Sequence, residues 1–401
     1  MAAAFGLPCL GIATPIGRNK AEVAAGLFAG VRDGLVSRAD LLPGSNIIVG
    51  AVPGELPQVP KELGSFDCRN NQLMMLVLEE ISSGVDAAIV KYGRHRIAVV
   101  LGTSTSGIAE GEAAHAARVR NGSWPSGFHY SQQEPGNLAE FVARLLDLTG
   151  PAYTIATACS SSAKAFASGR RLIRAGLADA VIVGGADTLC RMTAGGFTAL
   201  EAVSQKKCNP FSIHRDGINI GEAAAAFLLT REPAEIDLAG AGESSDAHHI
   251  SAPDPEGRGA FGAMQAALDD AGLKPAEISY VNLHGTGTPL NDVAEGKAVN
   301  ALFGASTPCG STKALTGHTL GAAGACEAAF LWLSLSPTWN PHRRLPPHVW
   351  DGEADPSIPP LALVAPGTYF SAERGGEAML SNSFAFGGSN AALVLARRGT
   401  S

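Results

Sequence analysis

The sequence of 401 residues lacks several patterns that would place it in a common class of protein. Its seven cysteines are scattered, with no Cys-x-x-Cys pair and no spacing typical of a zinc site. No apolar run reaches the length of a transmembrane helix, and no signal peptide precedes the first predicted strand. Neither a Walker sequence nor a convincing GxGxxG stretch supports nucleotide binding. These absences predict a reduced, cytoplasmic protein with no metal site and no membrane anchor.

Positive charge and aromatic residues are also scarce. Lys and Arg number 30 against 37 Asp and Glu, and aromatic residues make up 6% of the chain. A net charge of −7 argues against general nucleic-acid binding, so an acidic partner would need a local basic patch. By contrast, the 48 glycines and the 46% of hydrophobic residues suit close packing of helices on sheets. The length predicts two or three domain-sized units.

The central stretch is Tyr153-Thr154-Ile155-Ala156-Thr157-Ala158-Cys159. It reads as a strand that ends in small residues, and a helix is predicted over residues 160–175. Cys159 then lies on a sharp turn at the positive end of a helix dipole, which is expected to lower the pKa of its thiol. A buried structural cysteine is the alternative for this residue considered alone.

The second half of the chain repeats the plan of the first. A strand over residues 278–283 ends in His284-Gly285-Thr286-Gly287-Thr288, as a strand ends near Thr105 in the first half. A small-residue turn and an apolar helix over residues 316–335 correspond to the helix after Cys159. Two similar α/β halves are predicted, with a boundary near residues 233–241. Asn137 is predicted to cap a helix, and residues 340–355 to form a surface loop. The other predicted strands cover residues 9–14, 46–52, 96–101, 180–185, 223–229, 379–383 and 391–396, and the other helices residues 20–28, 67–84, 108–118, 137–146 and 292–303.

Two further motifs carry chemistry. His284 follows a predicted strand directly, where α/β proteins place functional groups. Lys313 and His318 lie in Ser311-Thr312-Lys313-Ala314-Leu315-Thr316-Gly317-His318. His318 is expected to open a helix, whose dipole favours the neutral imidazole. A neutral imidazole that donates a hydrogen bond can stabilise an oxyanion or enolate.

Together these motifs resemble the β-ketoacyl–acyl-carrier-protein synthases, the condensing enzymes of fatty-acid and polyketide synthesis, of the elongating Cys-His-His type. The matching stretches are 157–162, 209–217, 284–289, 313–318 and 382–388. The resemblance implies the α/β thiolase fold, a duplicated five-layered αβαβα sandwich with halves at 1–235 and 236–401. It also implies a homodimer paired along strand 153–157, or a heterodimer with a related subunit. Substrates arrive on the phosphopantetheine of an acyl-carrier protein, and no further cofactor is expected.

The resemblance also implies the role of each site residue. Cys159 takes the acyl group, and the backbone N–H groups of Cys159 and Phe386 form the oxyanion hole. His284 and His318 stabilise the enolate that forms when a malonyl thioester loses carbon dioxide. Lys313 is expected to pair with Glu295, near Asp292 as a second supporting carboxylate. The remaining expected roles are pantetheine binding by Thr286 and Thr288, lining of the acyl pocket by Phe197 and Thr105, gating by Phe386, and fixing of loops by Arg215, Asp216 and Glu222.

Several residues depart from the pattern of the family. Ser160 stands where the fatty-acid enzymes mostly carry Ala, and Ser212 replaces an acidic residue. Thr105 is smaller and more polar than the usual residue near the acyl tail, and Lys164 lies within the catalytic helix. These departures leave two pathways open: fatty-acid synthesis, and a specialised pathway such as polyketide or aryl-polyene assembly. The candidates for docking an acidic carrier protein are Lys206, Lys207 and Arg69.

Two other functions fit parts of the sequence. Ser161-Ser162-Ala163-Lys164 matches the Ser-x-x-Lys pattern of penicillin-binding enzymes, but no Lys-Thr-Gly or Ser-Asp-Asn follows. A non-catalytic, chain-length-determining partner subunit of a synthase pair would resemble the same family but lack the nucleophile. The presence of Cys159, His284 and His318 argues against that second alternative.

Overall fold

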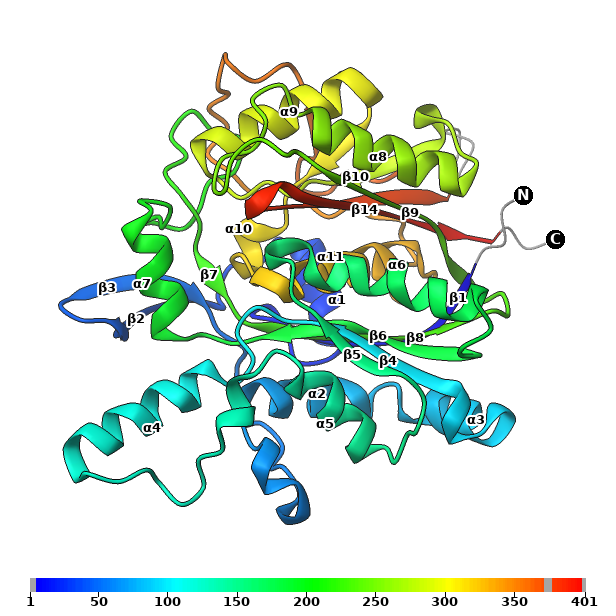
Figure 1. Cartoon of the computed structure of the whole chain (residues 1–401). Coiled ribbons are helices and arrows are strands. Elements are labelled where there is room, and N and C mark those ends of the chain that lie inside the picture. Colours follow the sequence, from blue (N-terminus) through cyan, green and yellow to red (C-terminus); the bar gives the residue numbers. More distant parts are fainter. Residues whose placement is uncertain (1–4, 371–376, 399–401) are drawn as a thin grey trace.

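The computed structural model describes residues 5–370 and 377–398. Its main feature is a pair of sheets stacked one above the other, with helices below, between and above them (Figure 1). The two sheets join where Phe5 and Gly6 of the first pair with Leu238 and Asp237 of the second. The five-layered αβαβα sandwich that the sequence predicts is confirmed.

The two sheets share one pattern of strand directions. Three neighbouring strands of each sheet run parallel, with a short fourth at the end of the second sheet, and two more follow in antiparallel order. The shared order of strand directions corresponds to the two similar halves that the sequence predicts. The first sheet consists, in spatial order, of β5 (Ala152–Ile155), β4 (Ile97–Gly102), β6 (Ala180–Asp187), β8 (Ala223–Thr230) and β1 (Phe5–Ala13). The second consists of β11 (Pro308–Gly310), β10 (Ile278–Asn282), β13 (Ala378–Ala385), β14 (Ser389–Arg397) and β9 (Ile236–Ser245), and the short β12 (Ala362–Leu363) adds to β11.

The helices occupy three layers (Figure 1). The layer below the first sheet contains α2 (Arg69–Glu79), α3 (Ser82–Tyr92) and α5 (Asn137–Leu145). The middle layer contains α1 (Lys20–Ala29), α6 (Ser161–Arg174) and α11 (Ala323–Leu335). The layer above the second sheet contains α8 (Arg258–Ala271) and α9 (Pro289–Phe303). Outside the layers lie α4 (Ile108–Asn121), α7 (Arg191–Ala199), α10 (Lys313–Thr316) and a small sheet of β2 (Leu35–Leu42), β3 (Ser45–Gly50) and β7 (Ile220–Gly221).

The middle layer explains why this chain is rich in small residues. All thirteen residues of α11 are buried, because sheets cover the layer on both sides. A Cβ atom on Gly324 would lie 2.7 Å from the Cβ of Ala163, so only glycine allows this approach of α11 to α6. The backbone N–H of Ala325 also donates to Ser162 Oγ at 2.9 Å. These contacts fix the start of α6 against the start of α11.

Some local predictions were wrong. The helix predicted over residues 67–84 is two helices, α2 and α3, and strands β2 and β9 were missed. Asn137 is the first residue of α5 rather than its cap, and its buried side chain accepts a hydrogen bond from Asn71. The segment 345–348 of the predicted surface loop 340–355 is buried, and within it His348 accepts from the N–H of Ser311 and contacts the Pro210 carbonyl. β9 begins at Ile236, next to the predicted division at 235/236, and that division into two units stays a prediction.

Candidate active site

Cys159 lies on a strained turn between β5 and α6. Ala158 has φ of 51°, in the left-handed region that non-glycine residues rarely adopt. A short 3-10 segment, Ala158–Ser160, then leads into α6. Leu320, with φ of 50°, begins the equivalent 3-10 segment before α11. The two halves therefore present the start of a middle-layer helix at the same place, and Cys159 occupies that of the first half.

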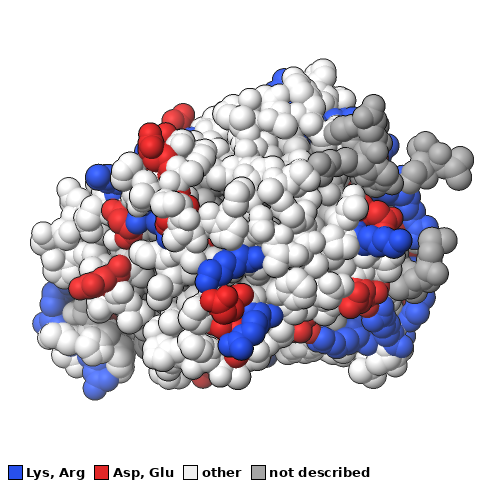
Figure 2. All heavy atoms as spheres, turned by 90° about the horizontal axis from the view of Figure 1, so that it is seen from above, with Lys and Arg blue, Asp and Glu red and all other residues white. Residues whose placement is uncertain are grey.

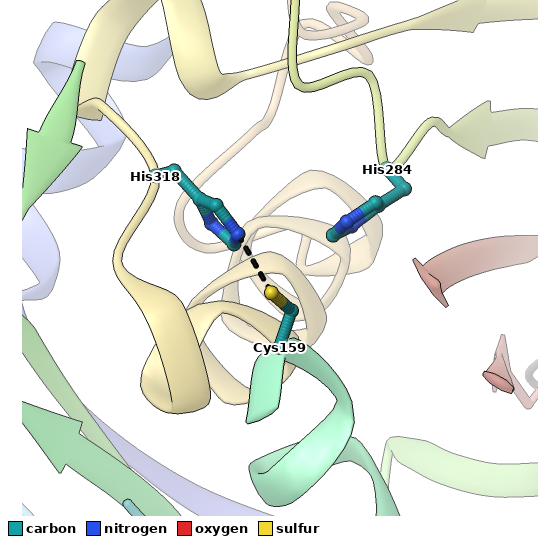
Figure 3. Close-up of side chains that lie close together, drawn as sticks. All are labelled: Cys159, His284 and His318. Carbon is teal, nitrogen blue, oxygen red and sulfur yellow. Dashed lines mark hydrogen bonds between the residues drawn. The ribbon is translucent and has the colours of Figure 1, made fainter. Parts of the chain in front are cut away.

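Two imidazoles face the thiol (Figure 3). His318 Nε2 lies 3.0 Å from Cys159 Sγ, and both residues are buried. The ring of His284 lies 5.4 Å from that of His318, at an angle of 85° between the planes. Potential ligand atoms of all three residues lie within 4.8 Å of one another. The predicted Cys-His-His set therefore converges on one point.

Burial sets the protonation of this group. It raises the pKa of the Cys159 thiol to about 11, against a smaller lowering by Lys313 and by the backbone N–H groups of Phe386 and Cys159. The expectation of a lowered thiol pKa is therefore wrong for the free enzyme, because the effect of burial exceeds that of Lys313 and of the two backbone N–H groups. Burial and the Lys313 cation lower the pKa values of His284 and His318 well below 6.5. The resting group is a neutral thiol beside two neutral imidazoles.

The partner of Lys313 is Glu327, not Glu295. The ammonium of Lys313 contacts the Glu327 carboxylate, and both side chains are almost fully buried. Lys313 Nζ also lies 3.4 Å from His284 Nδ1. Because an ammonium only donates, His284 Nδ1 accepts, and the neutral ring carries its proton on Nε2. Lys313 thus sets the tautomer of His284.

Glu295 and Asp292 support the loop after β10 through its backbone. Glu295 accepts from the N–H groups of His284 at 2.6 Å and Gly285 at 2.7 Å. Asp292 accepts from Gly287 N at 3.1 Å and from Phe211 N at 2.8 Å. These bonds hold the His284 loop without touching the imidazole. His318 itself does not open a helix, since it lies between α10 and the 3-10 segment Leu320–Ala322.

A narrow cavity opens beside the three residues. It adjoins a wider cavity of about 280 Å³, with which it shares Ala202, Thr288, Asn291, Phe384 and Phe386. Thr286 and Thr288, whose hydroxyls lie 2.9 Å apart, line the narrow cavity, and their binding of pantetheine stays a prediction. The rings of Phe197 and Phe386 are 5.8 Å apart on its wall. The residues lining the narrow cavity are Cys159, Phe197, Ala202, Ile218, His284, Thr286, Thr288, Asn291, His318, Phe384 and Phe386.

Comparison with known proteins assigns this site to a family. The family model described as beta-ketoacyl synthase, N-terminal domain, matches residues 71–234, and the model of the C-terminal domain matches residues 236–347. The chain belongs to the β-ketoacyl synthase family. It is therefore a condensing enzyme of the acyltransferase class.

Relatives of known function lie within this family. The 3-oxoacyl-[acyl-carrier-protein] synthase 2 of Staphylococcus aureus is 32% identical over 96% of this chain and 98% of its own. A chain in the structure of the ketosynthase ApeO with its chain length factor ApeC, from Xenorhabdus doucetiae, is 47% identical. It superposes with a TM-score of 0.92 over 99% of this chain and 98% of its own. The ishigamide ketosynthase/chain length factor is 27% identical, with a TM-score of 0.88 over the whole of both chains.

Thr105 is not among the residues that line the narrow cavity of this β-ketoacyl synthase, and its role at the acyl tail stays a prediction. Its buried hydroxyl donates to Asp187 at 2.8 Å and accepts from the N–H of Thr188 at 3.0 Å. Asp187 also accepts from Ser104 N and from Ala322 N, so it joins the two halves behind the thiol. Asp187 and Glu327 were not among the residues predicted from the sequence. Glu327 is the one charged residue in the otherwise apolar stretch 323–335, and this was the available signal.

The Ser-x-x-Lys alternative also fails on geometry. Ser161 Oγ donates to the Ala158 carbonyl at 2.6 Å, and Lys164 Nζ bonds to Ser389 instead of Ser161. Arg215 is bound to Asp355 and to the carbonyls of Ser212 and Pro289, as expected of a residue that fixes a loop. Within residues 5–370 and 377–398, no helix is long and apolar enough to cross a bilayer.

Proposed function

We propose that this enzyme takes an acyl group onto Cys159 and condenses it with the malonyl thioester of an acyl-carrier protein, with loss of carbon dioxide. The product is a 3-oxoacyl thioester. The observation that carries the proposal is the convergence of one thiol and two neutral imidazoles on one narrow cavity. The proposal requires no cofactor, since the chain and the carrier's phosphopantetheine supply every reacting group.

Acyl transfer uses His318 as the proton acceptor. Because the pKa of the thiol is raised to about 11, the thiol loses its proton as it attacks, and His318 Nε2 is 3.0 Å away. The Cys159–acyl bond forms while the pantetheine sulfur leaves and takes the proton from His318. The N–H groups of Cys159 and Phe386 both point towards the sulfur, where they are placed to bind the oxyanion of the acyl carbonyl.

Decarboxylation uses both imidazoles. The malonyl carbon–carboxylate bond breaks, and its electron pair moves onto the thioester carbonyl as an enolate. His284, with its proton on Nε2, donates to that negative charge, and His318 does so in the tautomer that carries its proton on Nε2. The carbanion attacks the acyl carbon, and the Cys159 sulfur leaves. Thr286 and Thr288 hold the pantetheine arm, and Phe386 separates the acyl side of the cavity from the malonyl side.

The direct test is mass spectrometry of the enzyme after incubation with a panel of acyl-carrier proteins. We expect the acyl group of the preferred carrier on the peptide that contains Cys159, and its transfer to malonyl carrier as a 3-oxoacyl product. Acylation absent from every member of the panel would support the alternative of a non-catalytic partner subunit. Blocking by a thiol-directed inhibitor is the control for the site of attachment.

The carrier protein is expected to dock on local basic residues. Lys206 and Lys207 are exposed and follow Ala202 of the cavity wall by a few residues. The third predicted docking residue, Arg69, already binds Glu222 through two hydrogen bonds, at 2.6 and 2.9 Å, and we do not propose it for docking. We therefore keep Lys206 and Lys207 as the proposed docking residues.

Reversing both charges with Lys206→Glu and Lys207→Glu should raise KM for carrier-bound malonate about tenfold and leave kcat and small thioester substrates almost unchanged. The matched control is Lys91→Glu on α3, an exposed lysine of the lower helix layer. An equal rise in KM for small thioesters, or an equal effect of the control, would exclude this docking surface.

The enzyme is proposed to act as a dimer through β5. This strand is the terminal strand of the first sheet, and Tyr153 on it is exposed. The 47% identity to a chain of the ApeO–ApeC complex, against 32% to the Staphylococcus aureus synthase, supports a specialised pathway. It also supports a heterodimer with a chain length factor-like subunit as much as a homodimer.

A further inference from the structure

Two of the residues that depart from the family pattern meet at one hydroxyl. Lys164 Nζ lies 2.6 Å from Ser389 Oγ, and Ser160 Oγ lies 3.4 Å from the same atom. Ser160 follows the nucleophile directly, and Ser389 follows the turn Phe386-Gly387-Gly388 directly. Ser389 therefore connects the turn that holds Cys159 to the turn that holds Phe386.

The position of Lys164 needs an explanation. It lies in the first turn of α6, where the helix dipole disfavours a cation. Its side chain is only 17% exposed, and its nearest carboxylate, Glu243, is 3.9 Å away. Glu243 forms a closer ion pair with Arg171. The direct hydrogen bond of Lys164 is thus the one to Ser389, and it reaches from the catalytic helix to the second sheet.

The Phe386 turn is held on its other side by backbone contacts. Gly387 N donates to the Ile250 carbonyl at 2.8 Å, and Asp246 N donates to the Gly388 carbonyl at 2.9 Å. Ser160 in turn donates to the Thr157 carbonyl at 2.9 Å, within the Cys159 turn. Since the N–H of Phe386 must stay aimed at the Cys159 sulfur, the contact between these two turns has a functional consequence.

We propose that Lys164 is a positioning residue that, through Ser389 and Ser160, holds the Phe386 N–H in register with Cys159 for acyl transfer. This inference rests on the proposed function. It assigns Lys164 to acyl transfer, the step that uses the oxyanion hole. It assigns Lys164 no part in decarboxylation, because the hydrogen bonds and the ion pair of His284, His318 and Lys313 are made with other residues. Separate measurement of acylation and decarboxylation therefore distinguishes this role from a general effect of the substitution on the fold.

The test compares Lys164→Met with Arg171→Met. Both remove a cation from α6 near Glu243, but only Lys164 touches Ser389. We expect Lys164→Met to slow acylation of Cys159 about tenfold, in the range of coupling between residues in contact. Decarboxylation of malonyl carrier and the melting temperature should change little, and Arg171→Met should leave both half-reactions as in the parent enzyme.

A double-mutant cycle completes the test. Ser389→Ala should reproduce the acylation defect, and Lys164→Met combined with Ser389→Ala should be no slower than either single variant. Additive losses, an unchanged acylation rate in Lys164→Met, or an equal loss of decarboxylation would overturn the inference. If the parent enzyme itself shows neither half-reaction, the proposed function fails, and that outcome is distinct from failure of the Lys164 role.

Discussion

Replacement of Cys159 by Gln is expected to abolish condensation and to leave decarboxylation of malonyl carrier measurable. The enolate forms between His284 and His318, and no step of its formation needs the thiolate. The side chain of Gln also fills the position of an acylated cysteine, so the two imidazoles stay available to the malonyl carbonyl. The measurement is carbon dioxide release from malonyl carrier, run beside acyl labelling of the enzyme.

His318→Ala and His284→Ala should instead slow decarboxylation itself, and with it condensation. Each removes a donor aimed at the developing enolate, and the loss of one such donor costs about 10²–10³ in rate. His284→Ala should keep acyl transfer better than His318→Ala, because only His318 Nε2 lies 3.0 Å from the thiol. If Cys159→Gln loses decarboxylation as completely as His318→Ala, with the same melting temperature, the assigned roles are wrong.

Much of the architecture could be predicted from the sequence, because duplication and buried strands leave strong patterns. β4, β8 and β10 are short apolar runs, and each ends close to the predicted residue. β2 was missed because six of its eight residues are partly or fully exposed, so it carries no apolar run. The helix predicted over 67–84 was divided in the structure at Glu80 and Ile81, where no glycine or proline marks the break.

The catalytic residues could be predicted where a short sequence motif identifies them. Contacts that depend on how distant segments pack together could not. Cys159, His284, His318 and Lys313 converge as expected. The partner of Lys313 depended on which buried carboxylate the fold brings near, and α11 supplies Glu327 where the sequence suggested Glu295. The raised pKa of the thiol depended on the depth of burial, which a helix-dipole argument from sequence leaves out.

Loss of the Lys313 cation should change the pH dependence of decarboxylation. The neutral imidazoles are the active forms, and their pKa values lie well below 6.5 because of burial and because of Lys313. As the pH falls through 6.5, the folded enzyme therefore keeps both rings neutral, and activity is lost only at lower pH. Without the cation both pKa values rise, so the acidic limb of the rate profile moves to higher pH.

The variant for this test must leave no buried charge alone. Lys313→Met would strand the carboxylate of Glu327, whose pKa burial raises to about 7, and breaking a buried pair costs about 3–5 kcal/mol of stability. The double variant Lys313→Met with Glu327→Gln removes both charges. We expect it to fold and to lose about 10²-fold in decarboxylation at alkaline pH, since His284 also loses the contact that sets its tautomer.

The matched control is Lys297→Met, which removes an ion-paired lysine from α9, away from the imidazoles. Its decarboxylation rate and acidic limb should coincide with those of the parent enzyme. In the double variant the acidic limb of the pH–rate profile should move towards pH 6.5. An acidic limb at the same pH as in the parent enzyme would show that Lys313 does not control the protonation of His284 and His318. Acylation of Cys159 should also slow, because the cation that opposes the raised pKa of the thiol is gone. The Lys313 ammonium would then act on both half-reactions. It would act on decarboxylation through the tautomer and charge of the imidazoles, and on acylation through the thiolate of Cys159.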